Sequence, residues 1–376
     1  DNNITVRMHS LSNDNFISSN ILEDDLKRIY SSLSTLDKLN NKVILITGCA
    51  GFLGFYFLQF LLNYANKLGI KKIIGLDNFL FGEPLWIKSL KKMYPRIFFL
   101  SQFDIAKDNL DEISNIKKVN FVIHCASIAS PTYYRKFPLE TIDANIWGLR
   151  SLLDFYRDSK FLKGFLFFSS SEIYGDPDKH NIPTDEDYAG NVLCTGPRSC
   201  YDESKRFGET LCWVYAQKYD MSITIARPFN NFGPGMSIND KRLPADLAKC
   251  ILENKDIVIY SNGAPTRTFC YISDAIAGYL ACLLYGKYNY FNIGSDSQEI
   301  SITNFAKIFK KFGNEIFNYS GDIIYEISDD LEYMTNNPNR RCPNIGKARA
   351  LLNYNPQVSI EDGVKNYLSF IKQENI

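Results

Sequence analysis

Three glycines at a spacing of three residues constrain the fold of this chain more than any other feature. Gly48, Gly51 and Gly54 follow the apolar run KVILIT and open a stretch with helical periodicity, GFLGFYFLQFLL. In this context the first glycine permits a tight turn and the second lets the backbone approach a pyrophosphate. The third glycine lets the helix pack closely on a sheet, and the helix N-terminus faces the phosphate charge. The motif therefore predicts a strand, a phosphate-binding loop and a helix.

The pattern around this motif predicts an α/β fold. Apolar runs of strand length alternate with longer segments of helical period, which is typical of a Rossmann-type, doubly wound parallel sheet. The predicted strands span 42–47, 71–77, 97–104, 121–127, 164–170 and 222–229, and the clearest predicted helices span 139–159 and 199–218. We expect three parts: an N-terminal extension over 1–40 packed on the surface, a dinucleotide-binding domain over 41–230, and mainly a smaller substrate-binding C-terminal lobe over 231–376.

Composition excludes several classes of function. Lys+Arg and Asp+Glu both total 42, so no global field draws the chain to nucleic acid or to an anionic membrane. The longest apolar stretch, 52–62, is well short of the roughly 20 residues that a membrane span needs. The polar N-terminus shows no signal-peptide pattern, and the nine cysteines form no CxxC pair. The three histidines do not cluster, so we expect no metal site and a cytoplasmic protein with free thiols.

Acidic residues at the ends of predicted strands indicate the cofactor. Asp77 lies 23 positions after Gly54, where a carboxylate hydrogen-bonds the adenosine ribose and repels a 2′-phosphate, which favours NAD over NADP. Asp104 could bond the adenine amine or, equally well, cap a helix. The predicted cofactor-binding residues are Gly48, Gly51, Phe52, Leu53, Gly54, Asp77, Asn78, Asp104, Ile105, Cys125, Ala126, Ser127, Tyr201, Lys205 and Arg227.

A second group of residues predicts the chemistry. Tyr201 precedes Lys205 by four positions in GPRSCYDESKR, and Ser170, Ser171 and Glu172 lie in SSSEIYGDP. Each pattern is weak alone. Together with the glycine loop, they describe one reaction centre, in which a nicotinamide takes hydride from a sugar carbinol while the tyrosine takes the proton.

These segments together resemble the extended short-chain dehydrogenase/reductase family, and within it the nucleotide-sugar decarboxylases and 4,6-dehydratases. The likeness runs from about residue 42 to the C-terminus and is densest in HCASIASPTYY, SSSEIYGDP, GPRSCYDESKR, RPFNNFGPGMSIND and TRTFCYISD. It is strongest to the UDP-glucuronate decarboxylases. The resemblance implies tightly bound NAD, a UDP-sugar substrate, a homodimer built from two helices of each subunit, and a role in polysaccharide biosynthesis.

The resemblance also implies roles for single residues. Tyr201 matches the family's base, and Lys205 the lysine that lowers the pKa of that base. Ser170 matches a hydroxyl that bonds the sugar's 4-oxygen, and Glu172 an acid/base near C5. Residues matched to substrate binding are Tyr133, Asn230, Arg242, Tyr260 and Arg267, with Tyr260 stacking on the nucleotide base, and Arg341, which matches an arginine near the reacting end of the sugar.

Three outcomes stay open from the sequence. The Ser171-Glu172 pair lacks the aspartate of dTDP-glucose dehydratases, which favours decarboxylation, although GDP-mannose dehydratases also carry Ser-Glu there. Asp143 and Gly235 replace a lysine and an arginine of the decarboxylase pattern, which removes positive charge and favours a 4,6-dehydratase. A C4 epimerase is the third outcome, although simple C4 epimerases usually lack a glutamate at position 172. A non-catalytic NAD-binding regulator is the alternative of a different class.

Overall fold

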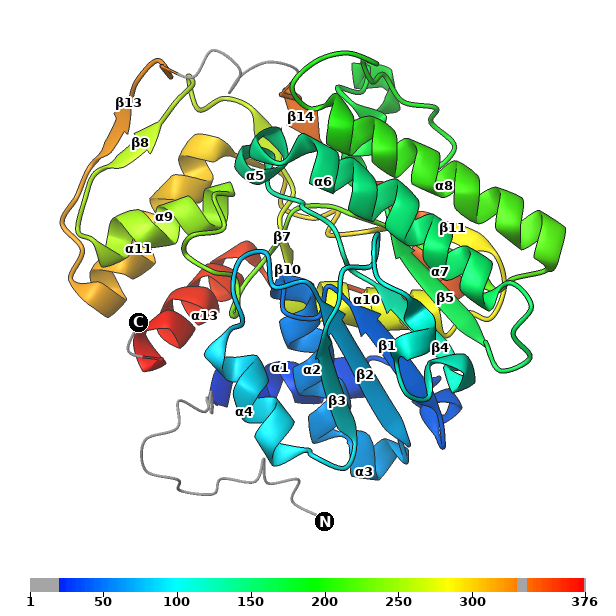
Figure 1. Ribbon diagram of the computed structural model, residues 1–376. Helices are drawn as coiled ribbons and strands as arrows, with labels where there is room; N and C mark the ends of the chain where they lie inside the picture. Colours follow the sequence, from blue (N-terminus) through cyan, green and yellow to red (C-terminus); the bar gives the residue numbers. More distant parts are fainter. Residues whose placement is uncertain (1–19, 330–336, 375–376) are drawn as a thin grey trace.

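Seven parallel strands form the central sheet within residues 20–329 and 337–374, which the computed structural model describes (Figure 1). In spatial order they are β3 (Phe98–Gln102), β2 (Lys72–Asp77), β1 (Val43–Thr47), β4 (Phe121–His124), β5 (Gly164–Phe168), β6 (Ile223–Pro228) and β11 (Asn289–Ile293). The order reverses between β1 and β4, and such a switch point is where doubly wound sheets bind ligands. The predicted Rossmann-type sheet is confirmed.

Helices cover both faces of this sheet, which explains why β1 and β5 are continuous apolar runs. One layer contains α1 (Asn20–Ser31), α2 (Phe52–Asn63), α3 (Ala65–Leu68), α4 (Leu85–Met93) and α10 (Ile272–Leu283), whose buried side chains share one core. The opposite layer contains α7 (Leu149–Tyr156) and α8 (Ser199–Tyr219), with α5 (Pro131–Lys136) and α6 (Pro138–Ile142) beside α8 (Figure 1).

The predicted helix over 139–159 contains an irregular turn. A π-helical segment, η4 (Asp143–Gly148), joins α6 to α7. Single π-turns inside α-helices are frequent at functional sites. Here the turn presents Asp143 to the large cavity described below and buries Asn145, whose Nδ2 donates a hydrogen bond to Ser204 Oγ of α8 at 2.9 Å. The irregular turn thus joins the helix that carries Tyr201 to its neighbour.

The C-terminal half builds a smaller lobe beside the carboxyl edge of the sheet (Figure 1). Its helices are α9 (Leu243–Leu252), α11 (Ile302–Phe317), α12 (Gly346–Leu352) and α13 (Ile360–Gln373). Its short strands are β7 (Asn231–Phe232), β8 (Ile257–Ile259), β9 (Thr266–Arg267), β10 (Cys270–Tyr271), β12 (Ile300–Ser301), β13 (Ile323–Tyr325) and β14 (Arg340–Arg341). Between them, α10 and β11 return to the large domain, and β11 is a strand that the sequence pattern did not reveal.

The N-terminal extension is anchored by a buried carboxylate. Helix α1 lies within the predicted extension over 1–40, of which residues 1–19 are outside the described part of the chain. Asp25 Oδ2 accepts hydrogen bonds from Tyr56 of α2 at 2.8 Å and from Tyr271 of β10 at 2.7 Å. Burial raises the pKa of Asp25 to about 7. The helix therefore ties the large domain to the start of α10 through a carboxyl that titrates near neutrality.

Candidate active site

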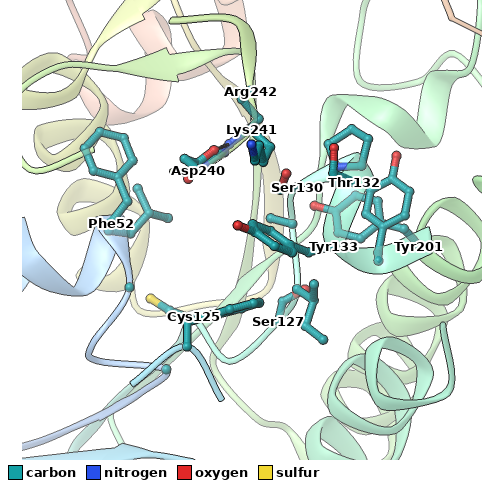
Figure 2. A pocket seen from close by; sticks show the side chains of 18 of the residues that line it. Phe52, Cys125, Ser127, Ser130, Thr132, Tyr133, Tyr201, Asp240, Lys241 and Arg242 are labelled. Carbon is teal, nitrogen blue, oxygen red and sulfur yellow. Dashed lines mark hydrogen bonds and ion pairs between the residues drawn. The ribbon is translucent and has the colours of Figure 1, made fainter. Parts of the chain in front are cut away.

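A cavity of about 1190 Å³ lies between the carboxyl edge of the sheet and the smaller lobe. Pockets for single small ligands are typically about 300–1,000 Å³, so this cavity has room for a cofactor and a substrate together. With the exception of Arg227 and Arg341, all the residues predicted for the site line it. Figure 2 shows Tyr133 and Tyr201 facing into this space, with Phe52 of the glycine loop on the far side from Tyr201.

The glycine loop has the shape that a dinucleotide requires. Gly48 has a φ of +64°, and a Cβ there would lie 2.6 Å from the backbone of Ala126. A Cβ on Gly54 would lie 2.2 Å from the carbonyl oxygen of Cys49, whereas one on Gly51, the N-cap of α2, would meet only Gly48 O at 3.4 Å. The side of the loop at Gly51 is therefore open to the cavity, as the approach of a pyrophosphate to the helix N-terminus demands.

Polar groups along the cavity fit a bound NAD. The buried hydroxyls of Ser127 and Ser169 line it and have no hydrogen-bond partner among the described residues. Buried polar atoms are normally paired, so these two hydroxyls indicate a ligand with polar atoms of its own. Asp77 accepts from the backbone N–H of Ala50 (2.9 Å) and of Phe79 (2.8 Å), which fixes its carboxylate at the cavity wall.

Asp104 takes a role close to the second one predicted for it. Its Oδ1 accepts the backbone N–H of Ala106 at 3.0 Å, which caps a turn, although no α-helix follows. Asp104 also lines the cavity. The predicted helix cap is therefore wrong, and the contact with the adenine amine stays a prediction.

The hydroxyl groups of Tyr201 and Ser170 lie at one end of the cavity, with Lys205 beside them. We call it the oxidising end, after the role predicted for Tyr201 from the sequence. Burial raises the pKa of Tyr201 to about 12, and a hydrogen bond with Ser170 opposes that rise. Burial also lowers the pKa of Lys205 to about 7. The Lys205 ammonium donates to Phe168 O at 2.7 Å and lies 5.6 Å from the centre of the Tyr201 ring. Tyr201 therefore needs added positive charge before it can act as a base near neutral pH.

Glu172 and three arginines form the charged end of the cavity. Glu172 Oε2 lies 2.5 Å from Arg198 Nη2, and Glu172 Oε1 lies 3.1 Å from Arg341 Nη1. Burial alone would raise the pKa of Glu172, but the charges of Arg341, Arg198 and Arg267 outweigh it and lower that pKa to about 2. Asp202 lies beyond Arg198, at 3.7 Å from its Nε, and its pKa is raised to about 7 by burial and by the charge of Glu172.

The substrate lobe brings a third group of charges to the cavity. Arg242 Nε and Nη2 bind Asp240 at 2.5 and 2.8 Å, and both residues line the cavity with Lys241 (Figure 2). Tyr133 donates from its hydroxyl to Asn239 O at 2.8 Å, which joins α5 to this loop. Asn230 and Tyr260 also line the cavity.

Two predicted site residues have other contacts. The Arg227 guanidinium is buried and paired to Glu209 at 2.7 Å, and it donates to Tyr174 Oη and Glu186 O, so it does not reach the cofactor cavity. Arg341 is 2 % exposed and donates to Ser171 Oγ at 3.1 Å and to Gly175 O at 2.5 Å. It does not line the cavity, but its partners Glu172 and Ser171 do.

Two residues of the site were missed by sequence reasoning. Arg198 lines the cavity one helical turn before Tyr201, and its contact with Glu172 joins positions 26 apart in the chain. Tyr134 stacks on Tyr201 with ring centres 4.8 Å apart, and its buried hydroxyl has no partner among the described residues. The pair Tyr133–Tyr134 gave no sign in the sequence of which ring would face the base.

Gly235 explains one departure from the decarboxylase pattern. It has a φ of +84°, and a Cβ there would lie 2.5 Å from the Phe55 ring. An arginine at this position would require α2 and the Gly235 loop to move apart. The lost positive charge is therefore a consequence of close packing in this chain.

Comparison with known proteins places the chain in a family. Residues 44–294 match the model of the NAD dependent epimerase/dehydratase family. The chain belongs to this family. It is 32% identical over 355 residues to UDP-glucuronic acid decarboxylase 1 of Xenopus tropicalis, which covers 94% of this chain and 77% of that protein. It is 33% identical over 326 residues to UDP-glucuronic acid decarboxylase 3 of Arabidopsis thaliana, covering 86% and 87% of the two chains.

Among solved structures, the chain is similar to UDP-glucuronic acid 4-epimerase from Bacillus cereus in complex with UDP-glucuronic acid and NAD. The TM-score is 0.72 at 28% identity, covering 88% of this chain and 99% of that chain. Its fold is also that of dTDP-glucose 4,6-dehydratase from Bacillus anthracis in complex with NAD, with a TM-score of 0.71 at 21% identity, covering 88% and 97%. An enzyme named as an epimerase and one named as a dehydratase therefore share the fold of this chain.

No helix within 20–329 and 337–374 is long and apolar enough to cross a membrane. In the same ranges, no three histidine, cysteine or acidic side chains are grouped as metal ligands would be.

Proposed function

We propose that the protein decarboxylates a UDP-linked sugar acid, UDP-glucuronate, to the UDP-pentose through a 4-keto intermediate. The observation that carries this proposal is Arg198, which lines the cavity one helical turn from Tyr201 and is paired with Glu172. An arginine beside the reacting carbons suits a substrate whose C6 is a carboxylate, because guanidinium and carboxylate form strong charge-assisted hydrogen bonds. The decarboxylases that match most of the chain support the same assignment.

The first half of the proposed reaction is oxidation at C4. NAD, when bound, supplies hydride acceptance and return. Ser170 bonds the 4-oxygen of the sugar and Tyr201 takes the proton of the 4-hydroxyl as the C4–H bond breaks. The two hydroxyls share a hydrogen bond, so one proton path serves both the sugar and the base.

The second half follows from the ketone. A 4-ketone makes the C6 carboxylate part of a β-keto acid, so the C5–C6 bond breaks and CO2 leaves an enolate across C4 and C5. C5 takes up a proton that comes from solvent by way of Glu172, which starts and ends as a carboxylate. Tyr201 returns its proton to the 4-oxygen as C4 is reduced, which yields the pentose and restores the starting state of the protein.

We infer that NAD is the cofactor in preference to NADP. Asp77 is fixed at the cavity wall by two backbone N–H groups, so a 2′-phosphate beside it would meet a carboxylate that cannot turn away. Equal affinity of the protein for NAD and NADP, measured by titration, contradicts this inference.

We propose that four residues hold the nucleotide of the substrate and its diphosphate: Asn230, Arg242, Tyr260 and Arg267. Tyr133 and Asn239 lie at the rim of this part of the cavity.

A 4,6-dehydratase is the second candidate, and the state of Glu172 favours it. A glutamate with a pKa of about 2 is a carboxylate at neutral pH, which suits removal of the C5 proton from a neutral sugar. The absence of a lysine at Asp143 and of an arginine at Gly235 points the same way. We prefer the decarboxylase because Arg198 lines the cavity beside this carboxylate, where a neutral sugar would need no guanidinium.

The test is the mass of the product. Purified protein is incubated with UDP-glucuronate, UDP-glucose, dTDP-glucose, GDP-mannose and CDP-glucose in parallel. The proposal predicts loss of CO2 from UDP-glucuronate alone. Loss of water from a neutral nucleotide sugar establishes the dehydratase instead, and a product of UDP-glucuronate with unchanged mass establishes an epimerase.

We also propose that the protein is a homodimer joined through α6, η4 and α8. These segments pack on one another and expose large apolar side chains: Leu139 (70 %), Trp147 (59 %), Phe207 (49 %) and Trp213 (52 %). Exposed apolar groups gathered on neighbouring helices are typical of protein interfaces. Light scattering should give twice the chain mass, and Trp213→Glu should shift the protein to the monomer. A monomeric unmodified protein at micromolar concentration contradicts the assignment.

A further inference from the structure

Two arginines share the carboxylate of Glu172, and only one of them lines the cavity. Arg198 holds Oε2 at 2.5 Å and Arg341 holds Oε1 at 3.1 Å. Arg198 lines the cavity, whereas Arg341 is 2 % exposed and faces Ser171 and the backbone. An anionic ligand in the cavity can therefore reach the first arginine and not the second.

Glu172 lies next to the reacting groups. Its backbone N–H donates to Ser170 Oγ at 3.1 Å, and Ser170 shares a hydrogen bond with Tyr201. The Arg198 Nε is buried with no hydrogen-bond partner among the described residues, so this guanidinium has unused donor capacity facing its acidic neighbours. A sugar whose 4-hydroxyl meets Ser170 and Tyr201 brings C5 and C6 toward this pair.

We propose that the carboxylate of the acidic sugar takes Arg198 from Glu172, and that Glu172 takes up a proton as a result. Binding of the substrate thus converts Glu172 from a carboxylate into the acid that protonates C5. The inference rests on the proposed function and assigns the step that makes the acid. A neutral sugar leaves the Glu172–Arg198 pair intact and Glu172 ionised.

The electrostatics of the site support the direction of this change. Loss of an arginine partner raises the pKa of a carboxyl, and so does a second carboxylate nearby. The charges of Arg341, Arg198 and Arg267 now hold the pKa of Glu172 low against the effect of burial, so the loss of Arg198 to the substrate favours the protonated form of Glu172. Arg341 stays paired with Glu172 and keeps the group in place.

Other titratable and charged groups face the same carboxylate. Arg267 and Arg341 lie beside it, Asp202 lies across Arg198, and the hydroxyls of Tyr134 and Tyr201 feel its charge. Asp202 is the competing proton acceptor because its pKa is raised to about 7 by burial and by Glu172. A test of the proposal therefore has to separate Glu172 from Asp202.

The step balances with one proton from solvent, the proton that Glu172 takes up when the substrate binds. CO2 leaves with the C5–C6 electron pair retained in the enolate. The Glu172 O–H bond breaks as the C5–H bond forms, which returns Glu172 to a carboxylate. Because the substrate carboxylate has by then become CO2, Arg198 is released and pairs with Glu172 again.

The experiment measures protons taken up on binding, in the absence of turnover. NAD-loaded Tyr201→Phe, which cannot oxidise the sugar, is titrated calorimetrically with UDP-glucuronate and UDP-glucose slightly above neutral pH. Two buffers of different ionisation enthalpy give the number of protons. We expect close to one proton for UDP-glucuronate and close to none for UDP-glucose. Adding Glu172→Gln should abolish the uptake, and adding Asp202→Asn should leave it.

Three results overturn the inference: no uptake with UDP-glucuronate, equal uptake with both sugars, or uptake that persists without Glu172 and disappears without Asp202. If the Glu172 variant does not fold, infrared difference spectra of the Tyr201→Phe and Tyr201→Phe/Asp202→Asn proteins replace it: a protonated-carboxyl band that appears with UDP-glucuronate in both proteins assigns the proton to Glu172, and a band that disappears with Asp202→Asn overturns the inference. If the unmodified protein decarboxylates UDP-glucuronate but the Tyr201→Phe protein takes up no proton on binding it, the inference is refuted and the proposed function stands. Protein that leaves UDP-glucuronate unchanged refutes the proposed function.

Discussion

The two ends of the cavity differ in what determines the ionisation of their buried groups. At the oxidising end, burial alone dominates: it raises the pKa of Tyr201 and lowers that of Lys205, which favours the uncharged forms of both. At the charged end, burial acts on Glu172 in the same direction, but three guanidinium groups outweigh it and keep the carboxylate ionised. In the proposed function, the first end carries out the C4 oxidation that decarboxylases, dehydratases and epimerases share. The second end then determines which bond changes next.

The largest effect is expected at the oxidising end. Tyr201→Phe removes the proton acceptor, so turnover should fall by about 10²–10⁴-fold while bound NAD is kept. Tyr133→Phe is the matched control, because that hydroxyl bonds Asn239 at the rim, and it should change turnover less than tenfold. Steady-state kinetics and the NAD content of purified protein check both. Near-normal turnover in Tyr201→Phe would mean that Tyr201 is not the base.

Glu172→Gln tests whether the charged end acts after the oxidising end. The variant keeps a side chain of the same shape but cannot give a proton to C5. C4 oxidation should proceed and the later steps should slow by about 10²-fold or more, so NADH absorbance should build up during turnover. A variant that forms no NADH with UDP-glucuronate means that Glu172 is needed before the sugar is oxidised, and the two ends are then not separate.

A pair of arginine variants tests what the charged end recognises. Arg198→Met should weaken binding of UDP-glucuronate by roughly ten- to a hundredfold and leave UDP unaffected, since a charge-assisted hydrogen bond contributes about 1.5–3 kcal/mol. Arg267→Met should weaken both ligands equally, because we assign that residue to the diphosphate. Calorimetry in the Tyr201→Phe background measures both. Equal loss for both ligands in Arg198→Met assigns that arginine to the diphosphate as well.

The last effect is on stability and not on turnover, and it is expected at Asp25, a carboxyl that is buried between two tyrosines and not among arginines. Burial raises its pKa to about 7, well above the unfolded value, so its contribution to stability is complete below about pH 4 and is lost as pH rises through 7. Asp25→Asn removes this dependence. From about pH 5 to about pH 8, the variant should gain roughly 1–4 kcal/mol of unfolding free energy relative to the unmodified protein. Denaturant curves at both pH values measure the gain, and a constant difference contradicts the assigned pKa.

The sequence revealed the parts of the site that local patterns encode. The strand, glycine loop and helix around Gly48 are contiguous, and Tyr201 and Lys205 lie on one helix, so these local patterns taken together predicted them. Arg198 escaped because its importance comes from a partner 26 residues away. Strand β11 escaped because NYFNI is short and carries two asparagines, and only its pairing with β6 makes it part of the sheet.

The wrong expectations have a shared cause. Arg227 lies in a motif dense with site residues, yet its side chain points to Glu209 and stabilises the end of β6. Arg341 is assigned to the sugar from its place in a motif, but its guanidinium is buried and paired with Glu172 and Ser171. A motif gives the position of a residue along the chain, whereas the direction of its side chain depends on packing that the motif does not describe.

The most direct test of the account is one reaction in D2O. Unmodified, NAD-loaded protein is mixed with UDP-glucuronate, and the product is read by mass spectrometry and by proton NMR at C5. The account predicts a UDP-pentose that has lost CO2 and carries one deuterium at C5, since the oxidising end returns hydride to C4 and the charged end supplies a solvent-derived proton. A product of unchanged mass without deuterium means that the charged end breaks no bond, and it contradicts the account.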